Sequence, residues 1–129
     1  MTYDKILNSE LLYVLSKLGH TQTICICDCG LPIPAGKTII DLSFIPGCID
    51  FLTVYNEIIR NSPFEKLYYA KETATANAPV INVIEKTDIE KESITHEELK
   101  EKSRDCYAFV RTGECTPYAN VILQAKTIF

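Results

Sequence analysis

A histidine and an aspartate in the N-terminal part of the sequence can together do acid–base chemistry. His20 is one of two histidines in the chain, and Asp28 follows it by eight residues. Histidine exchanges protons near neutral pH because its unperturbed pKa lies in that range. Asp28 directly follows a short apolar run, and open α/β sheets keep their ligands beyond the ends of such strands. The pair predicts proton transfer on a small molecule.

Further polar residues later in the chain indicate what kind of molecule. His96 follows Thr95 in a Thr-x-x-Glu capping box, so it is expected at the first position of a helix, beside unpaired backbone N–H groups, where a neutral ring can hydrogen-bond a neutral ligand. Tyr118 and Asn120 precede a buried strand, and both side chains donate and accept hydrogen bonds. These groups predict a polyol or sugar site. No phosphate-binding glycine loop, Ser/His/Asp set or metal-ligand spacing competes with it, so we expect no cofactor and no metal.

Each residue also has a simpler interpretation. A histidine after a helix often interacts only with the last helical carbonyls, and an aspartate shortly before a glycine often only stabilises a turn. His96 can equally be an exposed histidine at a helix start. The prediction of a site rests on the set of residues rather than on any one of them.

The cysteines offer a different chemistry. Cys25, Cys27 and Cys29 alternate along a predicted strand and would share one of its faces, where such neighbours are poor disulfide partners. Their spacing also lacks the Cys-x-x-Cys pairs of a zinc site. We interpret them as small buried hydrophobic residues, with a thiol-based metal or redox protein as the alternative.

Periodicity and caps define the elements that must position these residues. Apolar stripes at helical spacing and capping residues predict helices near 9–18, over 51–59, after Asn77 and from His96. Strands are predicted at Thr23–Cys27, Thr38–Leu42, Lys66–Ala70, Ile89–Ile94 (an edge strand), Cys106–Arg111 and Asn120–Ala125. Strands alternate with helices, which predicts a single three-layer α/β/α domain over residues 1–129 with a mixed, mostly parallel sheet.

Charge and hydropathy exclude several classes of partner. The net charge of −4 leaves no electrostatic footprint for nucleic acid. The apolar runs are far shorter than the roughly 20 residues of a membrane span. Because the basic start and hydrophobic core of a signal peptide are also missing, we expect a cytoplasmic protein without nucleic-acid or membrane partners.

Four sequence blocks, spread in order over nearly the whole chain, resemble the D-ribose pyranase family, the ribose branch of the ribose/fucose mutarotases. The blocks are Leu18-Gly19-His20-Thr21, Asp28-Cys29-Gly30-Leu31-Pro32-Ile33-Pro34, Thr95-His96-Glu97 and Arg111-Thr112-Gly113-Glu114-Cys115-Thr116-Pro117-Tyr118-Ala119-Asn120. The Gly-Leu-Pro-Ile-Pro form favours ribose over fucose, because the fucose branch usually lacks it.

The resemblance implies a cofactor-independent isomerase that interconverts the pyranose and furanose forms of β-D-ribose. It marks His20 as the catalytic acid and gives the sugar contacts to Asp28, His96 and Tyr118-Ala119-Asn120. It further implies a homo-oligomer, a decamer of two stacked pentameric rings, acting beside ribose uptake in the cytoplasm. The alternatives are a mutarotase acting on L-fucose or another sugar and a non-catalytic sugar-binding accessory of uptake.

Two departures from the family pattern stand out. Gln22 occupies a position where family members usually have Asp, so a charged support of His20 from that position is missing. The segment from about 71 to 88 is shorter than in the longer members, which affects the outer rim of the domain.

Overall fold

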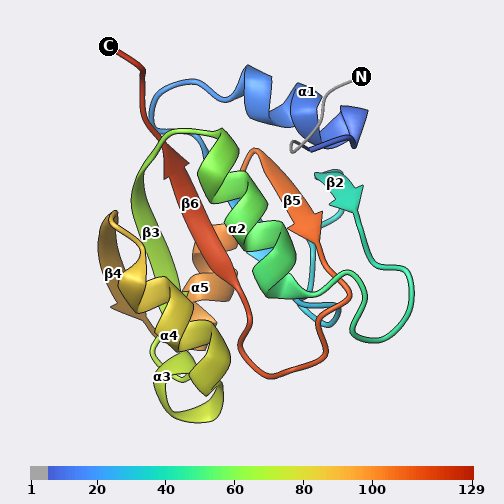
Figure 1. Cartoon of the computed structure of the whole chain (residues 1–129), viewed down its shortest axis with the longest axis vertical. Coiled ribbons are helices and arrows are strands. Elements are labelled where there is room, and N and C mark those ends of the chain that lie inside the picture. The colour runs from blue at the N-terminus through green and yellow to red at the C-terminus, as the bar shows by residue number, and fades with distance from the viewer. Residues whose placement is uncertain (1–5) are drawn as a thin grey trace.

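The computed structural model describes residues 6–129 (Figure 1) and has a six-stranded sheet at its centre. The strands are β1 (Thr23–Cys27), β2 (Thr38–Asp41), β3 (Phe64–Ala70), β4 (Glu90–Ile94), β5 (Ala108–Arg111) and β6 (Val121–Ala125), in the spatial order β2-β5-β1-β6-β3-β4. β6 runs antiparallel to β1 and β3, and the other neighbouring pairs are parallel. The predicted mixed, mostly parallel sheet is confirmed, with β4 at an edge.

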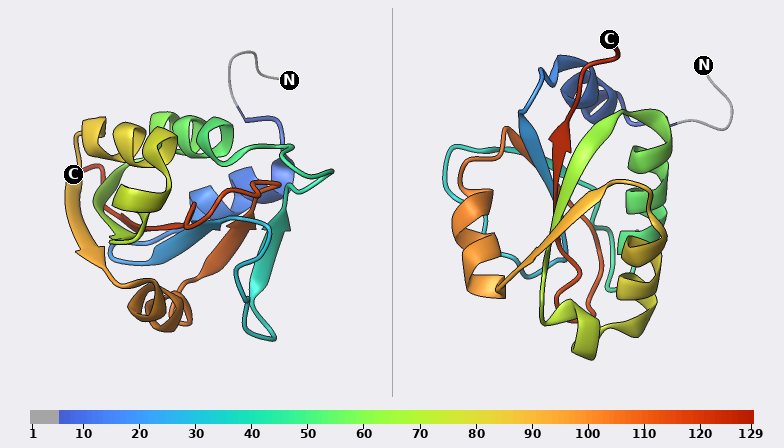
Figure 2. Two further views of the ribbon diagram at one scale, coloured as in Figure 1. Left: turned by 90° about the horizontal axis from the view of Figure 1, so that it is seen from below. Right: turned by 90° about the vertical axis from the view of Figure 1, so that its left-hand side faces the viewer.

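Helices cover both faces of this sheet. They are α1 (Ser9–Lys17), α2 (Phe51–Asn61), α3 (Thr73–Ala76), α4 (Ala78–Lys86) and α5 (His96–Ser103). The apolar faces of α1, α2 and α4 share one core cluster with the sheet, whereas Leu99 of α5 belongs to a second cluster on the other face. Figure 2 shows α2 and α4 on one side of the strands and α5 on the other, so the α/β/α layers are confirmed. No helix within residues 6–129 is long and apolar enough to cross a membrane.

Local capping explains where most helices begin. Asn8 caps α1 by accepting the Leu11 N–H at 2.9 Å, and Thr95 and Glu98 form the predicted capping box of α5. Asn77 precedes α4 as expected, but its side chain makes no capping bond and donates instead to the Pro117 carbonyl at 2.8 Å. The short helix α3 was not predicted from the sequence, because Thr-Ala-Thr-Ala carries no apolar stripe.

Successive side chains of strand β1 point alternately into the two cores. Ile24 and Ile26 point into the cluster shared with α1, α2 and α4, and Cys25 and Cys27 point into the cluster shared with α5. The interpretation of Cys25 and Cys27 as buried hydrophobic residues is confirmed. It is wrong for Cys29, which lies beyond the end of β1 and is partly exposed.

The strand directions define two ends of the sheet. The parallel strands β1 to β5 all finish at one end, called here the carboxyl end, and the antiparallel β6 starts there. The opposite end, called the amino end, is where these strands start and β6 finishes. Residues that directly follow β1, β3 and β4 and directly precede β6 are therefore neighbours in space.

Candidate active site

Asp28 and Asn120 form a reciprocal pair at the carboxyl end of the sheet. The Asp28 backbone N–H donates to Asn120 Oδ1 at 2.8 Å, and Asn120 Nδ2 donates to Asp28 Oδ2 at 3.2 Å. The Gly30 N–H donates to the other carboxylate oxygen of Asp28 at 3.0 Å. Asn120 is fully buried, so its amide holds the Asp28 carboxylate from the interior of the protein. The arrangement orients Asp28 as a hydrogen-bond acceptor for a ligand.

The electrostatics of Asp28 reflect its position at this end. Burial raises the pKa of Asp28, because desolvation disfavours the carboxylate. The hydrogen bonds from Gly30 and Asn120 and the charge of nearby His96 act in the opposite direction. Asp28 and His96 are thus electrostatic neighbours, although 68 positions separate them in the sequence.

His96 faces the same region with an unpaired nitrogen. Its Nδ1 is buried and has no hydrogen-bond partner in the part of the chain that the structure describes. Its ring lies edge-on to the Tyr118 ring, with centroids 5.0 Å apart and planes at 77°. Both carboxylate oxygens of Glu72 accept the His96 backbone N–H, each at 3.1 Å, which fixes the start of α5. Buried polar atoms are normally hydrogen-bonded, so a ligand group can supply the partner that this nitrogen lacks.

Tyr118 is held in an unusual backbone conformation by a residue of α3 and by the residue that precedes α4. Its φ of 57° is in the left-handed region, which costs a residue other than glycine on the order of 1 kcal/mol. Thr73 Oγ1 donates to the Tyr118 carbonyl at 2.9 Å, and Asn77 donates to the neighbouring Pro117 carbonyl. Both side chains are buried. They support the loop that presents Tyr118.

Ala119 lies between these polar residues but points away from them. Its side chain is fully buried in the core shared with α1, α2 and α4. Any contact of this residue with a ligand must therefore come from its backbone.

His20 lies at the amino end of the sheet, apart from this cluster. Its Nε2 is 3.1 Å from Glu65 Oε1, and Gln124 Nε2 donates to Glu65 Oε2 at 2.6 Å. The Gln124 hydrogen bond and the contact with His20 lower the pKa of Glu65. The His20 side chain is 54% exposed, so one edge of its ring faces outward.

Glu65 was not predicted as a site residue from the sequence. At the position of the family departure, Gln22 Oε1 accepts the Gly19 N–H at 2.7 Å and so closes the turn before His20. The carboxylate next to His20 comes from β3, which lies 45 residues further along. No pattern of nearby residues predicts a contact between His20 and Glu65. The signal, in retrospect, is an acidic residue at the start of a strand that pairs with β6.

A single chain keeps His20 and Asp28 apart. The five peptide steps from Thr23 to Asp28 alone span roughly 16 Å. β1 is paired on both sides, with β5 and β6, and its residues Ile24–Cys27 are fully buried, so it cannot fold back. The structure brings Asp28, His96, Tyr118 and Asn120 together and leaves His20 at the opposite end.

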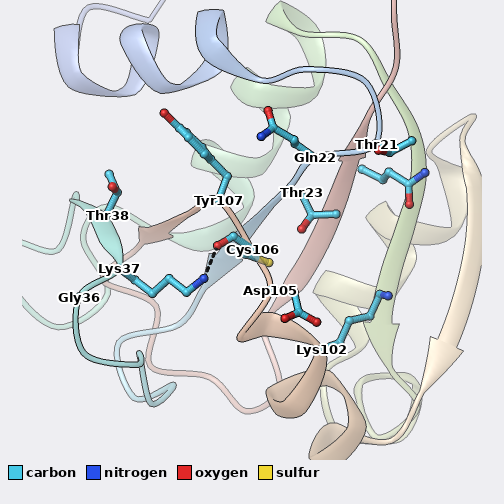
Figure 3. A pocket seen from close by; sticks show the side chains of 11 residues that line it. Thr21, Gln22, Thr23, Gly36, Lys37, Thr38, Lys102, Asp105, Cys106 and Tyr107 are labelled. Carbon is cyan, nitrogen blue, oxygen red and sulfur yellow. Dashed lines mark hydrogen bonds between the residues drawn. The ribbon is translucent and has the colours of Figure 1, made fainter.

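A cavity of about 630 Å³ lies at the amino end of the sheet, away from the cluster, and Figure 3 shows its lining. It is lined by Thr21 and Gln22, which follow His20, and by polar residues at the starts of β1, β2 and β5. Lys37 reaches across it and donates to the Cys106 carbonyl at 2.8 Å. None of the residues predicted to contact sugar lines this cavity, so its size alone does not mark the site.

Comparisons with known proteins agree with one another. The model of the RbsD / FucU transport protein family matches residues 1–128. The chain is 48% identical over 126 residues to the D-ribose pyranase of Bacillus cereus (strain 03BB102) and 44% identical over 124 residues to that of Exiguobacterium sibiricum, each alignment covering 96% of both chains.

Two solved structures have the same fold. The structure of Bacillus subtilis RbsD complexed with D-ribose superimposes with a TM-score of 0.94 at 41% identity, covering 100% of both chains. The fucose mutarotase of Streptococcus pneumoniae in complex with L-fucose gives a TM-score of 0.79 at 23% identity, covering 99% of this chain and 100% of that one, a likeness of fold alone.

Proposed function

This chain belongs to the RbsD / FucU transport protein family, and on that premise we propose that it is a D-ribose pyranase. It interconverts the β-pyranose and β-furanose forms of D-ribose. The observation that carries the proposal is the cluster at the carboxyl end of the sheet, where the oriented Asp28 carboxylate interacts electrostatically with His96, whose buried Nδ1 has no hydrogen-bond partner among residues 6–129. A sugar hydroxyl can satisfy both groups, since it donates to one and accepts from or donates to the other.

The reaction needs only proton transfer. Opening the hemiacetal ring requires a proton delivered to the ring oxygen and one removed from the anomeric hydroxyl, after which the chain rotates and closes on a different hydroxyl. A positioned acid or base within about 3 Å of these oxygens contributes roughly 10²–10⁴ in rate. His20 is the catalytic acid, and no cofactor or metal is needed for such a step.

The sugar contacts divide among the residues of the cluster. Asp28 accepts hydrogen bonds from sugar hydroxyls, and His96, Tyr118 and Asn120 hold the rest of the ring. Ala119 contributes its backbone, since its side chain is in the core. Glu72, Thr73 and Asn77 act through these residues by fixing their backbone.

Glu65 positions His20 for the chemistry. Its carboxylate lies against Nε2 of the partly exposed ring, and Nδ1 is the atom that exchanges a proton with the sugar. Gln124 holds the second carboxylate oxygen and so keeps Glu65 in place. Residue Glu65 is a positioning residue and does not touch the substrate.

The active site is completed between subunits. Since His20 lies roughly 16 Å or more from Asp28 in one chain, and a proton-transferring group must come within about 3 Å, His20 of one copy serves the cluster of another. The contact joins the amino end of one sheet to the carboxyl end of the next. A heterologous, head-to-tail contact of this kind forms a ring when its rotation closes. It is compatible with the homo-oligomer implied by the family, a decamer of two stacked pentamers, which we propose for this chain.

The surface offers apolar area for such contacts. Phe44 is 81% exposed and Ile45 56% exposed in the loop after β2, and Ile39 of the edge strand β2 is also exposed. Exposed apolar groups of this kind mark interaction surfaces. We further propose that residues 1–129 form one ribose pyranase-like domain and that the oligomer works in the cytoplasm, in line with the family match over residues 1–128.

Exchange spectroscopy on ribose tests the function. NMR magnetisation transfer between the pyranose and furanose signals should show faster exchange with the protein than in buffer. Exchange that stays at the buffer rate at every protein concentration would contradict the proposal. The same measurement on L-fucose separates the ribose enzyme from a fucose mutarotase: faster anomer exchange of fucose with unchanged ribose exchange would favour the latter.

A further inference from the structure

Two cysteines from different loops meet beside the sugar-binding cluster. The Sγ atoms of Cys29, in the loop after β1, and Cys115, in the loop between β5 and β6, are 3.6 Å apart. The Cys29 N–H donates to the Glu114 carbonyl at 3.0 Å, so backbone contacts hold the two loops together here. A disulfide requires the sulfurs at about 2.05 Å, which a movement of about 1.6 Å between the loops provides.

The two thiols differ from the buried cysteines in their access to solvent. Cys115 is exposed and Cys29 is partly exposed, whereas Cys25 and Cys27 are fully buried in the core. The hydrogen bond between the two sulfurs raises the pKa of Cys29, so Cys29 favours its protonated thiol form. Within one chain, Cys115 is the more accessible of the two sulfurs to a small oxidant.

We propose that Cys29 and Cys115 form a peroxide-sensitive modification site whose oxidation to a disulfide weakens sugar binding. The identity of the sugar rests on the proposed function, but the thiol pair does not. The Cys115 thiolate attacks the O–O bond of the hydroperoxide, forming an S–O bond and releasing hydroxide, which takes up a proton. The Cys29 sulfur, giving up its proton, then attacks the Cys115 sulfur, so that an S–S bond forms and the S–O bond breaks with loss of water. Two thiols are oxidised while one hydrogen peroxide is reduced to two waters.

The position of the pair connects oxidation to the sugar site. Cys29 directly follows Asp28, and Cys115 precedes Tyr118 on the loop that also ends in Asn120. Drawing the two loops together shifts Asp28 relative to its partner Asn120, whose mutual bonds are now 2.8 and 3.2 Å. A misplacement of about 1 Å can cost an enzyme roughly 100-fold in rate, and for ribose affinity we expect a smaller fall of about tenfold.

Peptide mapping tests the modification itself. After treatment of the reduced full-length protein with hydrogen peroxide and alkylation of the remaining thiols, trypsin should release peptides 18–37 and 112–126 as one disulfide-linked species. Cys29→Ser and Cys115→Ser should each abolish it, whereas Cys48→Ser, which removes another exposed thiol, should leave it unchanged. Absence of the linked species, its persistence in Cys29→Ser, or a bond between two chains on a non-reducing gel would overturn the proposal.

Calorimetric titration with ribose tests the consequence. The oxidised wild type should bind about tenfold more weakly than the reduced protein and recover on treatment with dithiothreitol, while oxidised Cys115→Ser keeps its affinity. A linked species with unchanged ribose affinity would contradict the effect on the site. Reduced protein that binds no ribose would contradict the proposed function instead, and the peptide map would still test the thiol pair.

Discussion

His20 and Asp28 lie at opposite ends of the same strand, β1. The sequence places them eight residues apart, and both belong to motifs of one family, yet one chain cannot bring them to one sugar. Extended backbone is the reason, since it converts a short sequence separation into roughly 16 Å of distance. In the mechanism we propose, His20 and the Asp28 cluster therefore meet only when two copies of the chain associate.

Removal of the acid should separate catalysis from binding. We expect His20→Ala to lower the pyranose–furanose exchange rate by roughly 10²–10⁴ while ribose affinity changes little, because Asp28, His96 and Asn120 remain in place. Magnetisation transfer gives the rate, and calorimetry gives the affinity. A His20→Ala protein that exchanges ribose as fast as wild type would assign the chemistry to another residue.

Neutralising Glu65 should affect turnover more than binding. Glu65→Gln removes the carboxylate next to His20 Nε2, so we expect the rate at saturating ribose to fall about tenfold with KM nearly unchanged. Glu57→Gln is the matched control, since Glu57 forms an exposed ion pair with Arg60 on α2. If Glu65→Gln raised KM and left the rate at saturation intact, a positioning role for Glu65 would be wrong.

Ribose binding should weaken in acid because of Asp28. Protonation turns one acceptor oxygen of Asp28 into a donor, and because burial raises its pKa above 3.8, this happens at a higher pH than for an ordinary aspartate. Calorimetric titrations across the acid range should show this loss, and Asp28→Asn should bind weakly at every pH without it. Wild-type affinity that stays constant through this range would rule out a carboxylate contact.

The raised pKa of Asp28 stabilises the folded protein in acid, although protonation of Asp28 weakens ribose binding there. A carboxyl group whose pKa is higher in the folded than in the unfolded protein binds its proton more tightly when folded, so its contribution to the free energy of unfolding is lost as the pH rises through the folded pKa. We therefore expect this part of the stability–pH curve, measured by urea unfolding without sugar, to disappear in Asp28→Asn.

The loop that presents Tyr118 should depend on a single buried hydroxyl. Thr73→Val leaves the Tyr118 carbonyl without its donor, and we expect a loss of about 1–3 kcal/mol in the free energy of unfolding, together with weaker ribose binding. Thr75→Val changes an exposed threonine of the same helix and should cost much less. Equal effects of the two substitutions on ribose affinity would contradict the role given to Thr73.

The elements predicted from the sequence were those governed by local signals. The helix near residues 9–18, the capping box at Thr95 and the stripe beginning at Phe51 each depend on signals within a few residues, and the structure confirms all of them. The alternation that placed Cys25 and Cys27 in the core stops where β1 stops, which is why the same pattern misplaced Cys29.

The candidate site could be predicted only in part, because some of its contacts join residues that are far apart in the sequence. Asp28, His96 and Asn120 each adjoin a strand end, so strand directions bring them together once the sheet is known. Glu65, Thr73 and Asn77 make their contacts across 40 to 45 positions. Such contacts depend on which strands and loops become neighbours, and a pattern of nearby residues does not contain that information.

Mixing two inactive variants tests the shared active site most directly. In an oligomer assembled from His20→Ala and Asp28→Ala chains, an intact His20 from the Asp28→Ala copy meets an intact cluster on the His20→Ala copy. Ribose exchange should be slow for each variant alone and should recover to a substantial fraction of the wild-type rate after joint unfolding and refolding. Mixed oligomers that remain as slow as the two separate variants would contradict an active site built from two subunits.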